Sequence, residues 1–159
     1  MHRLSILAAA LALCATPAAA HVVLANPVST PGAYYVAAFR VGHSCGVGQT
    51  TTALTIQLPP GVTSAKAQPK AGWAFEQAEG QVTWKGRLLE SEFDEFAILV
   101  RLPTDAAGPI YFPAVQTCDG GERRWVEIPD PGQPWTSKPS PAPVVTVDAP
   151  AQPAAQHQH

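Results

Sequence analysis

Hydrophobic and polar residues alternate along most of the chain between residues 35 and 102. This period of two is typical of strands that bury one face. The expected core-facing positions are Tyr35, Ala37, Phe39, Val41; Leu54, Ile56, Leu58; Val82, Trp84; and Phe96, Ile98, Val100, Leu102. Glycine or proline ends each run, and no segment of helical period lies between the runs. The pattern predicts an all-β protein of roughly seven or eight strands in two packed sheets, an immunoglobulin-like sandwich.

The two ends of the chain differ from this alternating region. Residues 1–20 combine a basic start, an apolar run of about ten residues and a small-residue stretch, which indicates a cleavable secretory signal peptide. The apolar run is too short to span a bilayer, so we expect a soluble periplasmic or secreted chain without a membrane span. Residues 129–159 are proline-rich with three charged residues, which predicts a disordered tail. The folded domain is therefore expected at residues 21–128.

Charge and cysteine content narrow the class of function. The 10 Lys+Arg and 12 Asp+Glu residues give a formal net charge of -2, which provides no basic excess for nucleic-acid binding. Signal cleavage would leave Cys45 and Cys118, and an even pair in an exported protein is most simply a disulfide. On the chain-entropy model such a bridge, closing a loop of about 70 residues, stabilises by roughly 3–4 kcal/mol. Free-thiol chemistry is therefore not expected.

His21 would become the first residue of the chain after cleavage at Ala20. The α-amine and the imidazole Nδ1 of one terminal histidine can chelate a single metal ion, an arrangement called a histidine brace. Metal binding displaces the proton of an amine whose ordinary pKa is about 7.7–8.0. Two nitrogens with a third nitrogen or oxygen in a plane suit Cu(II). The alternative interpretation is that His21 is a solvated terminal residue.

His43 is a second candidate ligand, because it follows the strand expected at residues 34–41 and lies two residues before Cys45. A disulfide at Cys45 would hold the loop rigidly, although a simple surface histidine fits equally well. Residues 42–46 also match the serine-nucleophile pattern G-x-S-x-G. That motif requires a following helix and a later histidine base, and the sequence predicts a Thr-rich strand there, so a hydrolase is disfavoured.

Trp125 and the last histidines are weaker candidates. If a strand continues to Ile128, Val126 and Ile128 share the core face and Trp125 lies on the other face. There it would wall a site or a partner surface, or cover a sheet edge. His157 and His159 form either a weak metal-capture sequence or a solvated end. An acidic cluster could be a paired-carboxylate site, but is better explained as a solvated strand face: Glu90, Glu92, Asp94 and Glu95.

Several dispersed motifs, in order, resemble the YcnI-like copper-binding domain family of exported bacterial proteins. They are Ala-His21-Val-Val, Gly-His-Ser-Cys-Gly at 42–46, Thr50-Thr-Thr-Ala-Leu54, Leu58-Pro-Pro-Gly-Val-Thr63, Pro69-Lys-Ala-Gly-Trp73, Phe112-Pro-Ala-Val-Gln-Thr-Cys118 and Arg124-Trp125-Val-Glu-Ile-Pro129. The resemblance covers about residues 21–129. It implies an immunoglobulin- or fibronectin-like sandwich that binds Cu(II) through the amine and imidazole of His21, with Trp125 beside the metal.

The sequence departs from that family at one ligand. In that family, a copper-binding carboxylate comes from the loop that corresponds to residues 41–49. This loop contains no Asp or Glu here, so His43 is the natural replacement as third ligand, and Glu122 or Glu127 are the next candidates. The leading interpretation is a monomeric, non-enzymatic protein of copper homeostasis that stores or buffers Cu(II), or exchanges it with a transporter or another exported chaperone. A histidine-brace copper monooxygenase acting on polysaccharide and a metal-free adhesion or structural sandwich are the alternatives.

Overall fold

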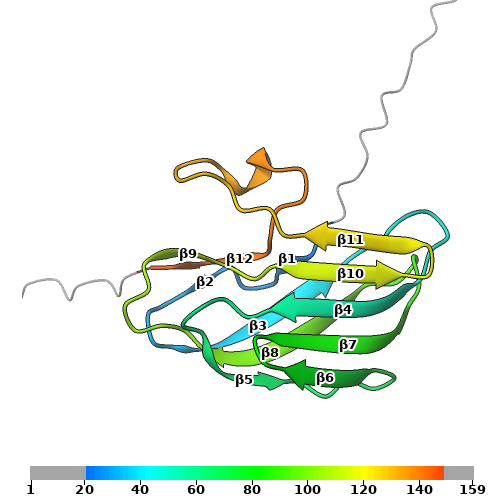
Figure 1. Ribbon diagram of the computed structural model, residues 1–159, viewed down its shortest axis with the longest axis horizontal. Coiled ribbons are helices and arrows are strands. Elements are labelled where there is room, and N and C mark those ends of the chain that lie inside the picture. The colour runs from blue at the N-terminus through cyan, green and yellow to red at the C-terminus, as the bar shows by residue number, and fades with distance from the viewer. Residues whose placement is uncertain (1–20, 149–159) are drawn as a thin grey trace, which may run out of the picture.

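The computed structural model describes residues 21–148, and its regular secondary structure is almost entirely strand (Figure 1). The predicted signal peptide, residues 1–20, and the tail histidines, His157 and His159, lie outside the described residues. The strands are β1 Val23–Leu24, β2 Val28–Ser29, β3 Tyr34–Val41, β4 Thr51–Gln57, β5 Thr63–Ala67, β6 Ala74–Ala78, β7 Gln81–Leu88, β8 Asp94–Arg101, β9 Gly108–Tyr111, β10 Ala114–Cys118, β11 Gly121–Trp125 and β12 Val144–Val147; one 3-10 turn, η1, covers Trp135–Ser137.

Two large sheets pack face to face, as Figure 1 shows. One has the strand order β1-β3-β8-β5 and the other the order β11-β10-β4-β7-β6, while β2-β12-β9 form a smaller third sheet. Neighbouring strands are antiparallel except for the parallel pair of β12 and β2. The predicted all-β sandwich is therefore confirmed, and no helix in residues 21–148 is long and apolar enough to cross a membrane.

The core lies between the two large sheets and contains the positions that the alternation predicts. Leu58 is partly buried and packs against the core, and the other predicted residues have exposed fractions of 6 % or less: Tyr35, Ala37, Phe39, Val41, Leu54, Ile56, Val82, Trp84, Phe96, Ile98, Val100 and Leu102. Each strand of a two-layer sandwich buries one face, so a local period of two is sufficient to identify that face.

Tyr35 is the polar exception within this set. Its hydroxyl donates a hydrogen bond of 2.5 Å to the carbonyl oxygen of Asn26, which ties the β1–β2 connection to β3. Burial raises the pKa of Tyr35 to about 12, so the phenol keeps the proton that it donates at all physiological pH values.

Residues 129–148 are folded, which corrects the prediction that a disordered tail starts at residue 129. Strand β12 pairs antiparallel with β9 and parallel with β2. Ala142, Val145 and Val147 are at most 1 % exposed. A strand of four residues carries too little pattern to stand out from a proline-rich background, because its stability comes from partner strands distant in sequence. The domain therefore extends at least to residue 147.

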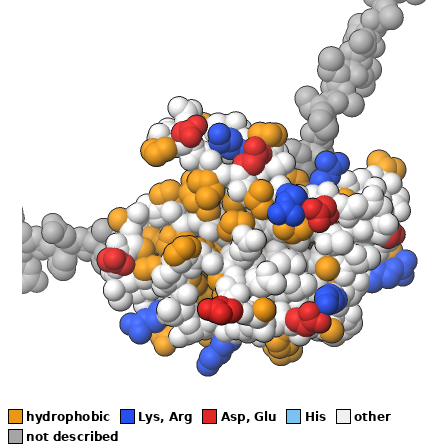
Figure 2. Space-filling model, viewed as in Figure 1, with side chains coloured by type: hydrophobic (Ala, Val, Ile, Leu, Met, Phe, Trp, Pro, Cys, Tyr) orange, Lys and Arg blue, Asp and Glu red, His pale blue; other side chains and the backbone are white. Residues whose placement is uncertain are grey.

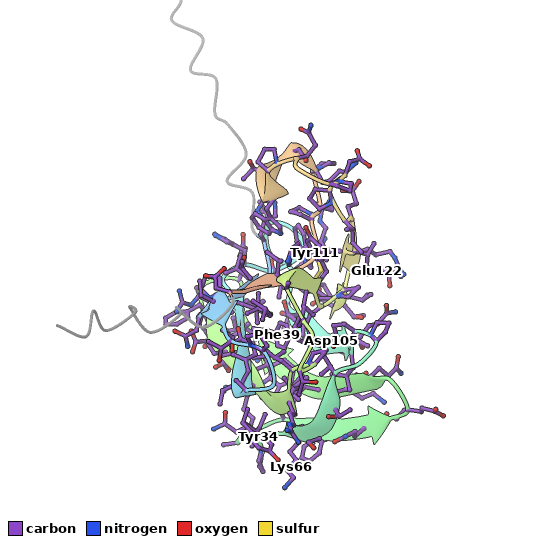
Figure 3. All side chains as sticks on the ribbon, turned by 90° about the vertical axis from the view of Figure 1, so that its left-hand side faces the viewer. Tyr34, Phe39, Lys66, Asp105, Tyr111 and Glu122 are labelled. Atoms are coloured by element: carbon purple, nitrogen blue, oxygen red, sulfur yellow. A yellow bond between two sulfur atoms is a disulfide. The ribbon has the colours of Figure 1, made fainter. Side chains whose placement is uncertain are left out.

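Residues 128–140, which we call the arm, project from the sandwich between β11 and β12 (Figures 1 and 3). Three hydrogen bonds join its two ends: the Glu127 amide donates to the Ser140 carbonyl oxygen (3.1 Å), the Ala142 amide to the Glu127 carbonyl oxygen (2.9 Å), and the Ser140 amide to Glu127 Oε2 (2.6 Å). The arm is thus a closed loop whose base is fixed to the domain at Glu127.

Candidate metal centre

The imidazole of His21 lies against two tryptophans at the start of β1. Its ring centroid is 5.2 Å from that of Trp125, with an interplanar angle of 49°, and 5.1 Å from that of Trp135, with an angle of 56°. His21 and Trp135 are partly buried, whereas Trp125 is 7 % exposed. Trp125 comes from the end of β11 and Trp135 from the arm, so the fold brings His21 against two rings that are distant from it in sequence.

Trp125 belongs to the core cluster, which corrects the prediction that it points away from the core. In the β10–β11 register it faces Ala114, which is fully buried, while Ile128 is 53 % exposed. The prediction assumed a strand that continues to Ile128. Pairing with β10 instead ends at Trp125, and the chain then turns towards residues 140–142, so the alternation does not extend past the strand.

Gln116 connects Trp125 to the loop that carries His43. Its Nε2 donates to the His43 carbonyl oxygen at 2.6 Å and to Thr51 Oγ1 at 2.8 Å, and its Oε1 accepts from Trp125 Nε1 at 3.4 Å. Gln116 is 1 % exposed. Sequence reasoning missed this residue, although a glutamine between Ala114 and Cys118 on the inward face of β10 is a signal, because a buried amide needs partners.

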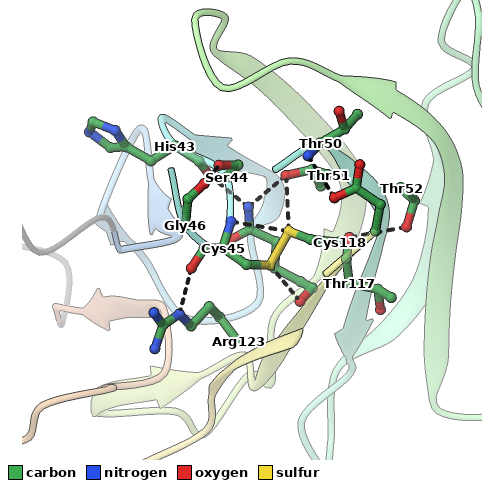
Figure 4. Close-up of a disulfide and its surroundings, with 12 residues drawn as sticks. His43, Ser44, Cys45, Gly46, Thr50, Thr51, Thr52, Thr117, Cys118 and Arg123 are labelled. Atoms are coloured by element: carbon green, nitrogen blue, oxygen red, sulfur yellow. Dashed lines mark hydrogen bonds between the residues drawn. A yellow bond between two sulfur atoms is a disulfide. The ribbon is translucent and has the colours of Figure 1, made fainter. Parts of the chain in front are cut away.

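The predicted disulfide between Cys45 and Cys118 is present, with an S–S distance of 2.04 Å and a sequence separation of 73 residues. It fixes the loop after β3 to the end of β10 (Figure 4). Arg123 on β11 adds a second link, since its Nε donates to the Cys45 carbonyl oxygen at 2.9 Å. The backbone of this loop is therefore held to β10 and β11, the strands that carry Gln116 and Trp125.

His43 is brought into this network by its backbone, while its side chain is exposed. Figure 4 shows the imidazole pointing away from the disulfide. Within residues 21–148, no group of three or more His, Cys, Asp or Glu side chains is arranged to hold a metal ion. Of the two reserve ligands, Glu122 pairs with Arg124 at 3.1 Å, and Glu127 Oε2 accepts the Ser140 amide.

The G-x-S-x-G segment does not form a nucleophile elbow. It leads into strand β4 and not into a helix, and Ser44 Oγ donates to the Gly46 carbonyl oxygen at 2.6 Å. A serine held in this way within a strand-to-strand loop lacks the sharp strand-to-helix turn that exposes a catalytic Oγ.

The acidic cluster is dispersed among separate partners. Glu90 accepts a hydrogen bond from the Gly48 amide, Glu92 accepts one from the Leu89 amide, Asp94 pairs with Lys70, and Glu95 pairs with Arg40. Each acid thus has its own local partner, which supports the solvated-strand interpretation. On the face that Figure 2 shows, acidic and basic side chains are interspersed, with no expanse of one sign.

Replacing Gln116 by leucine is expected to destabilise the domain by about 2–4 kcal/mol, because several buried polar groups would lose a partner at once. Those groups are the Trp125 indole N–H, the Thr51 hydroxyl and the His43 carbonyl. Thermal and denaturant unfolding would measure the loss. Gln57→Leu, at an exposed position of β4, is the control and should change stability by less than about 0.5 kcal/mol. Equal stability of the two variants would contradict a structural role for the Gln116 network.

Comparison with known proteins identifies the family but assigns no function. The model of a family described as a domain of unknown function, DUF1775, matches residues 21–147. No curated protein was found to match the chain. Copper binding, which the family description does not mention, therefore stays a prediction.

One solved structure confirms the immunoglobulin-like fold. An uncharacterised protein from Nocardia farcinica with an immunoglobulin-like fold is 29 % identical, with a TM-score of 0.64, and the match covers 80 % of this chain and 98 % of that one. The seventh ScaB type I cohesin from Pseudobacteroides cellulosolvens is 13 % identical, with a TM-score of 0.49, over 87 % of this chain and 97 % of that one. With the family model matching residues 21–147, the chain belongs to the DUF1775 family of immunoglobulin-like domains.

Proposed function

We propose that this protein binds Cu(II) outside the cytoplasm and stores, buffers or transfers it in copper homeostasis, with His21 as the principal ligand. The observation that carries the proposal is the position of His21: its imidazole is packed against Trp125, at the residue where signal cleavage would create a free amine. The Cys45–Cys118 disulfide is consistent with an extracytoplasmic location, where disulfides form and persist.

The packing of His21 favours chelation because it limits the freedom of the imidazole. A terminal residue is ordinarily mobile, and ordering a ligand costs conformational entropy on metal binding. Ring contacts with Trp125 and Trp135 reduce that cost before the ion arrives. The indole of Trp125 would act as a wall and not as a ligand, since its Nε1 carries a proton, which it donates to Gln116, and has no free lone pair.

His43 remains our choice for the third ligand. In the β1–β3 register Val23 faces Arg40 and Leu24 faces Phe39. Because the pair is antiparallel, His21, two residues before β1, and His43, two residues after β3, leave the pair at the same end. The exposed His43 side chain can change rotamer at low cost on a loop whose backbone is fixed by Gln116 and the disulfide. His157 and His159 would at most add a weak recruiting site.

A transport or storage role is favoured over a monooxygenase. An oxygen-activating copper site requires an open coordination position and a flat face for polysaccharide. Two indoles beside His21 would instead shield the ion. We therefore propose a non-enzymatic protein that exchanges copper with a transporter or another exported chaperone. A metal-free adhesion domain, the remaining alternative, would tolerate any residue at position 21.

Cu(II) titration followed by electron paramagnetic resonance tests the proposal on protein whose first residue is His21. We expect one tightly bound ion with nitrogen hyperfine structure, and loss of that signal in His21→Ala. His43→Ala should weaken binding and remove one nitrogen from the spectrum, whereas His157→Ala, the control, should leave both unchanged. Absence of binding, or a His21→Ala variant that binds copper as the wild type does, would contradict the proposal. If His43→Ala binds copper with unchanged affinity and spectrum, the third ligand is Glu122 or Glu127 and not His43.

A further inference from the structure

Trp125 and Trp135 contact His21 from two very different supports. Trp125 is in the core, at the end of a paired strand, with its indole N–H hydrogen-bonded to buried Gln116. Trp135 belongs to η1 in the arm, a three-residue turn in which no residue is fully buried. One wall of the His21 environment is therefore part of the sandwich, while the other belongs to a projecting loop.

The arm is attached to the domain at its base, where Pro129 is buried, and through Trp135. Beyond the base hydrogen bonds at Glu127, the Trp135 Nε1 donates to the Ala142 carbonyl oxygen at 2.7 Å, and its ring contacts His21. The charged residues of the arm, Asp130 and Lys138, pair with each other at 3.6 Å. Segments with few buried contacts open locally at much lower free energy than the whole domain. Breaking the contacts of a single indole would therefore let the arm move while the sheets stay intact.

We propose that the arm is a cap over the copper site and that Trp135 is the positioning residue that closes it. The inference rests on the proposed function, and it adds a control on how the ion leaves. Transfer of Cu(II) to an acceptor requires an incoming ligand to approach the ion before the His21 ligands depart. With Trp135 seated, one side of the imidazole is covered by the indole; with the arm open, that side is accessible to the acceptor. Trp125 stays in place in both states.

In this arrangement His21 binds the ion, while Trp135 controls how easily the ion is released. Aromatic contacts of this kind stabilise by an amount that corresponds to about two- to tenfold in an equilibrium or rate constant. Loss of the Trp135 ring should thus accelerate copper transfer by about that factor while leaving the ligand atoms unchanged. An acceptor protein that displaces Trp135 would obtain copper faster than a small chelator does, which gives the arm a role in choosing the partner.

Stopped-flow transfer of Cu(II) from the processed protein to excess EDTA tests the cap. We expect Trp135→Ala to transfer copper about two- to tenfold faster than the wild type, Trp135→Phe to lie between them, and Thr136→Ala, an exposed neighbour in the same arm, to match the wild type. The paramagnetic spectrum of Trp135→Ala should keep the wild-type nitrogen pattern. Unfolding temperatures would show that the variants are equally folded, since Trp135 is outside the core.

A second measurement does not need copper. In the metal-free protein, the NMR signals of the His21 imidazole protons should shift in Trp135→Ala, because the ring current of a neighbouring indole is lost, and stay in place in Thr136→Ala. Transfer rates and His21 shifts that are identical in Trp135→Ala and the wild type would overturn the cap while leaving copper binding intact. Failure of the wild type to bind Cu(II) would overturn the proposed function, and with it the cap.

Discussion

Truncation after Pro129 is expected to unfold the protein, whereas truncation after Asp148 should leave it folded. The first change removes β12, whose Val145 and Val147 are at most 1 % exposed. A fully buried valine contributes roughly 1.5–3 kcal/mol, so the two together account for at least about 3 kcal/mol. Loss of the hydrogen bonds of β12 to β9 and β2 adds to this. The sum is a large part of the roughly 5–15 kcal/mol that stabilises an ordinary domain.

Circular dichroism during heating and binding of a hydrophobic dye would compare the two truncations. The shorter protein should lose its cooperative transition and bind the dye, because removing β12 uncovers the core at β9 and β2. Truncation after Asp148 is the matched control, as it removes only residues outside the described domain. A cooperative transition of the shorter protein within a few degrees of the full chain would show that β12 is dispensable.

Most of the fold follows from local sequence pattern. In β3, β4, β7 and β8 each strand buries one face, so the inward residues repeat every second position and the pattern identifies them without knowledge of the partners. The disulfide follows from an even cysteine count in an exported chain, without geometric information. These predictions succeed because each depends on the strand itself or on chain chemistry.

The predictions that failed depend on where pairing stops and on which distant strand is the partner. Trp125 is inward because β11 ends there, a limit set by its register with β10 and not by the residues that follow. β12 is a strand because β9 and β2 offer it free edges. Trp135 lies in a proline-rich segment with no periodicity, so nothing local connects it with His21. Each error comes from tertiary pairing that overrides local composition.

The candidate site likewise contains residues that local sequence identifies and residues whose role depends on tertiary structure. His21 could be singled out because the predicted cleavage site would make it the first residue, which is a purely local signal. The resemblance also implies a tryptophan beside this histidine; the rings of Trp125 and His21 are in contact, and a role for Trp125 beside a copper ion stays a prediction. Gln116, which hydrogen-bonds to Trp125 and to the His43 backbone, required the register of β10 and the position of the loop, because its three partners come from separate segments of the chain.

One alanine retained before His21 is expected to weaken Cu(II) binding by about a hundredfold or more. The extension converts the α-amine of His21 into an amide, so the chelate formed by the amine and the imidazole of a single residue is lost. The ring contacts of His21 with Trp125 and Trp135 involve the imidazole, so they should survive the extension. Loss of one ligand should cost at least as much as the 10–100-fold that supporting residues around a metal contribute.

Competition titration against a chelator of known affinity, with mass spectrometry to verify the first residue, measures this effect. The control is His21→Ala at the true terminus, which keeps an amine but removes the imidazole. If the brace forms, both changes should cause large losses of affinity, and neither variant should show the spectrum of the tightly bound ion. Equal affinity of the extended and processed proteins would show that the imidazole binds without the amine. His21 would then be an ordinary side-chain ligand, whose affinity does not depend on signal cleavage at Ala20.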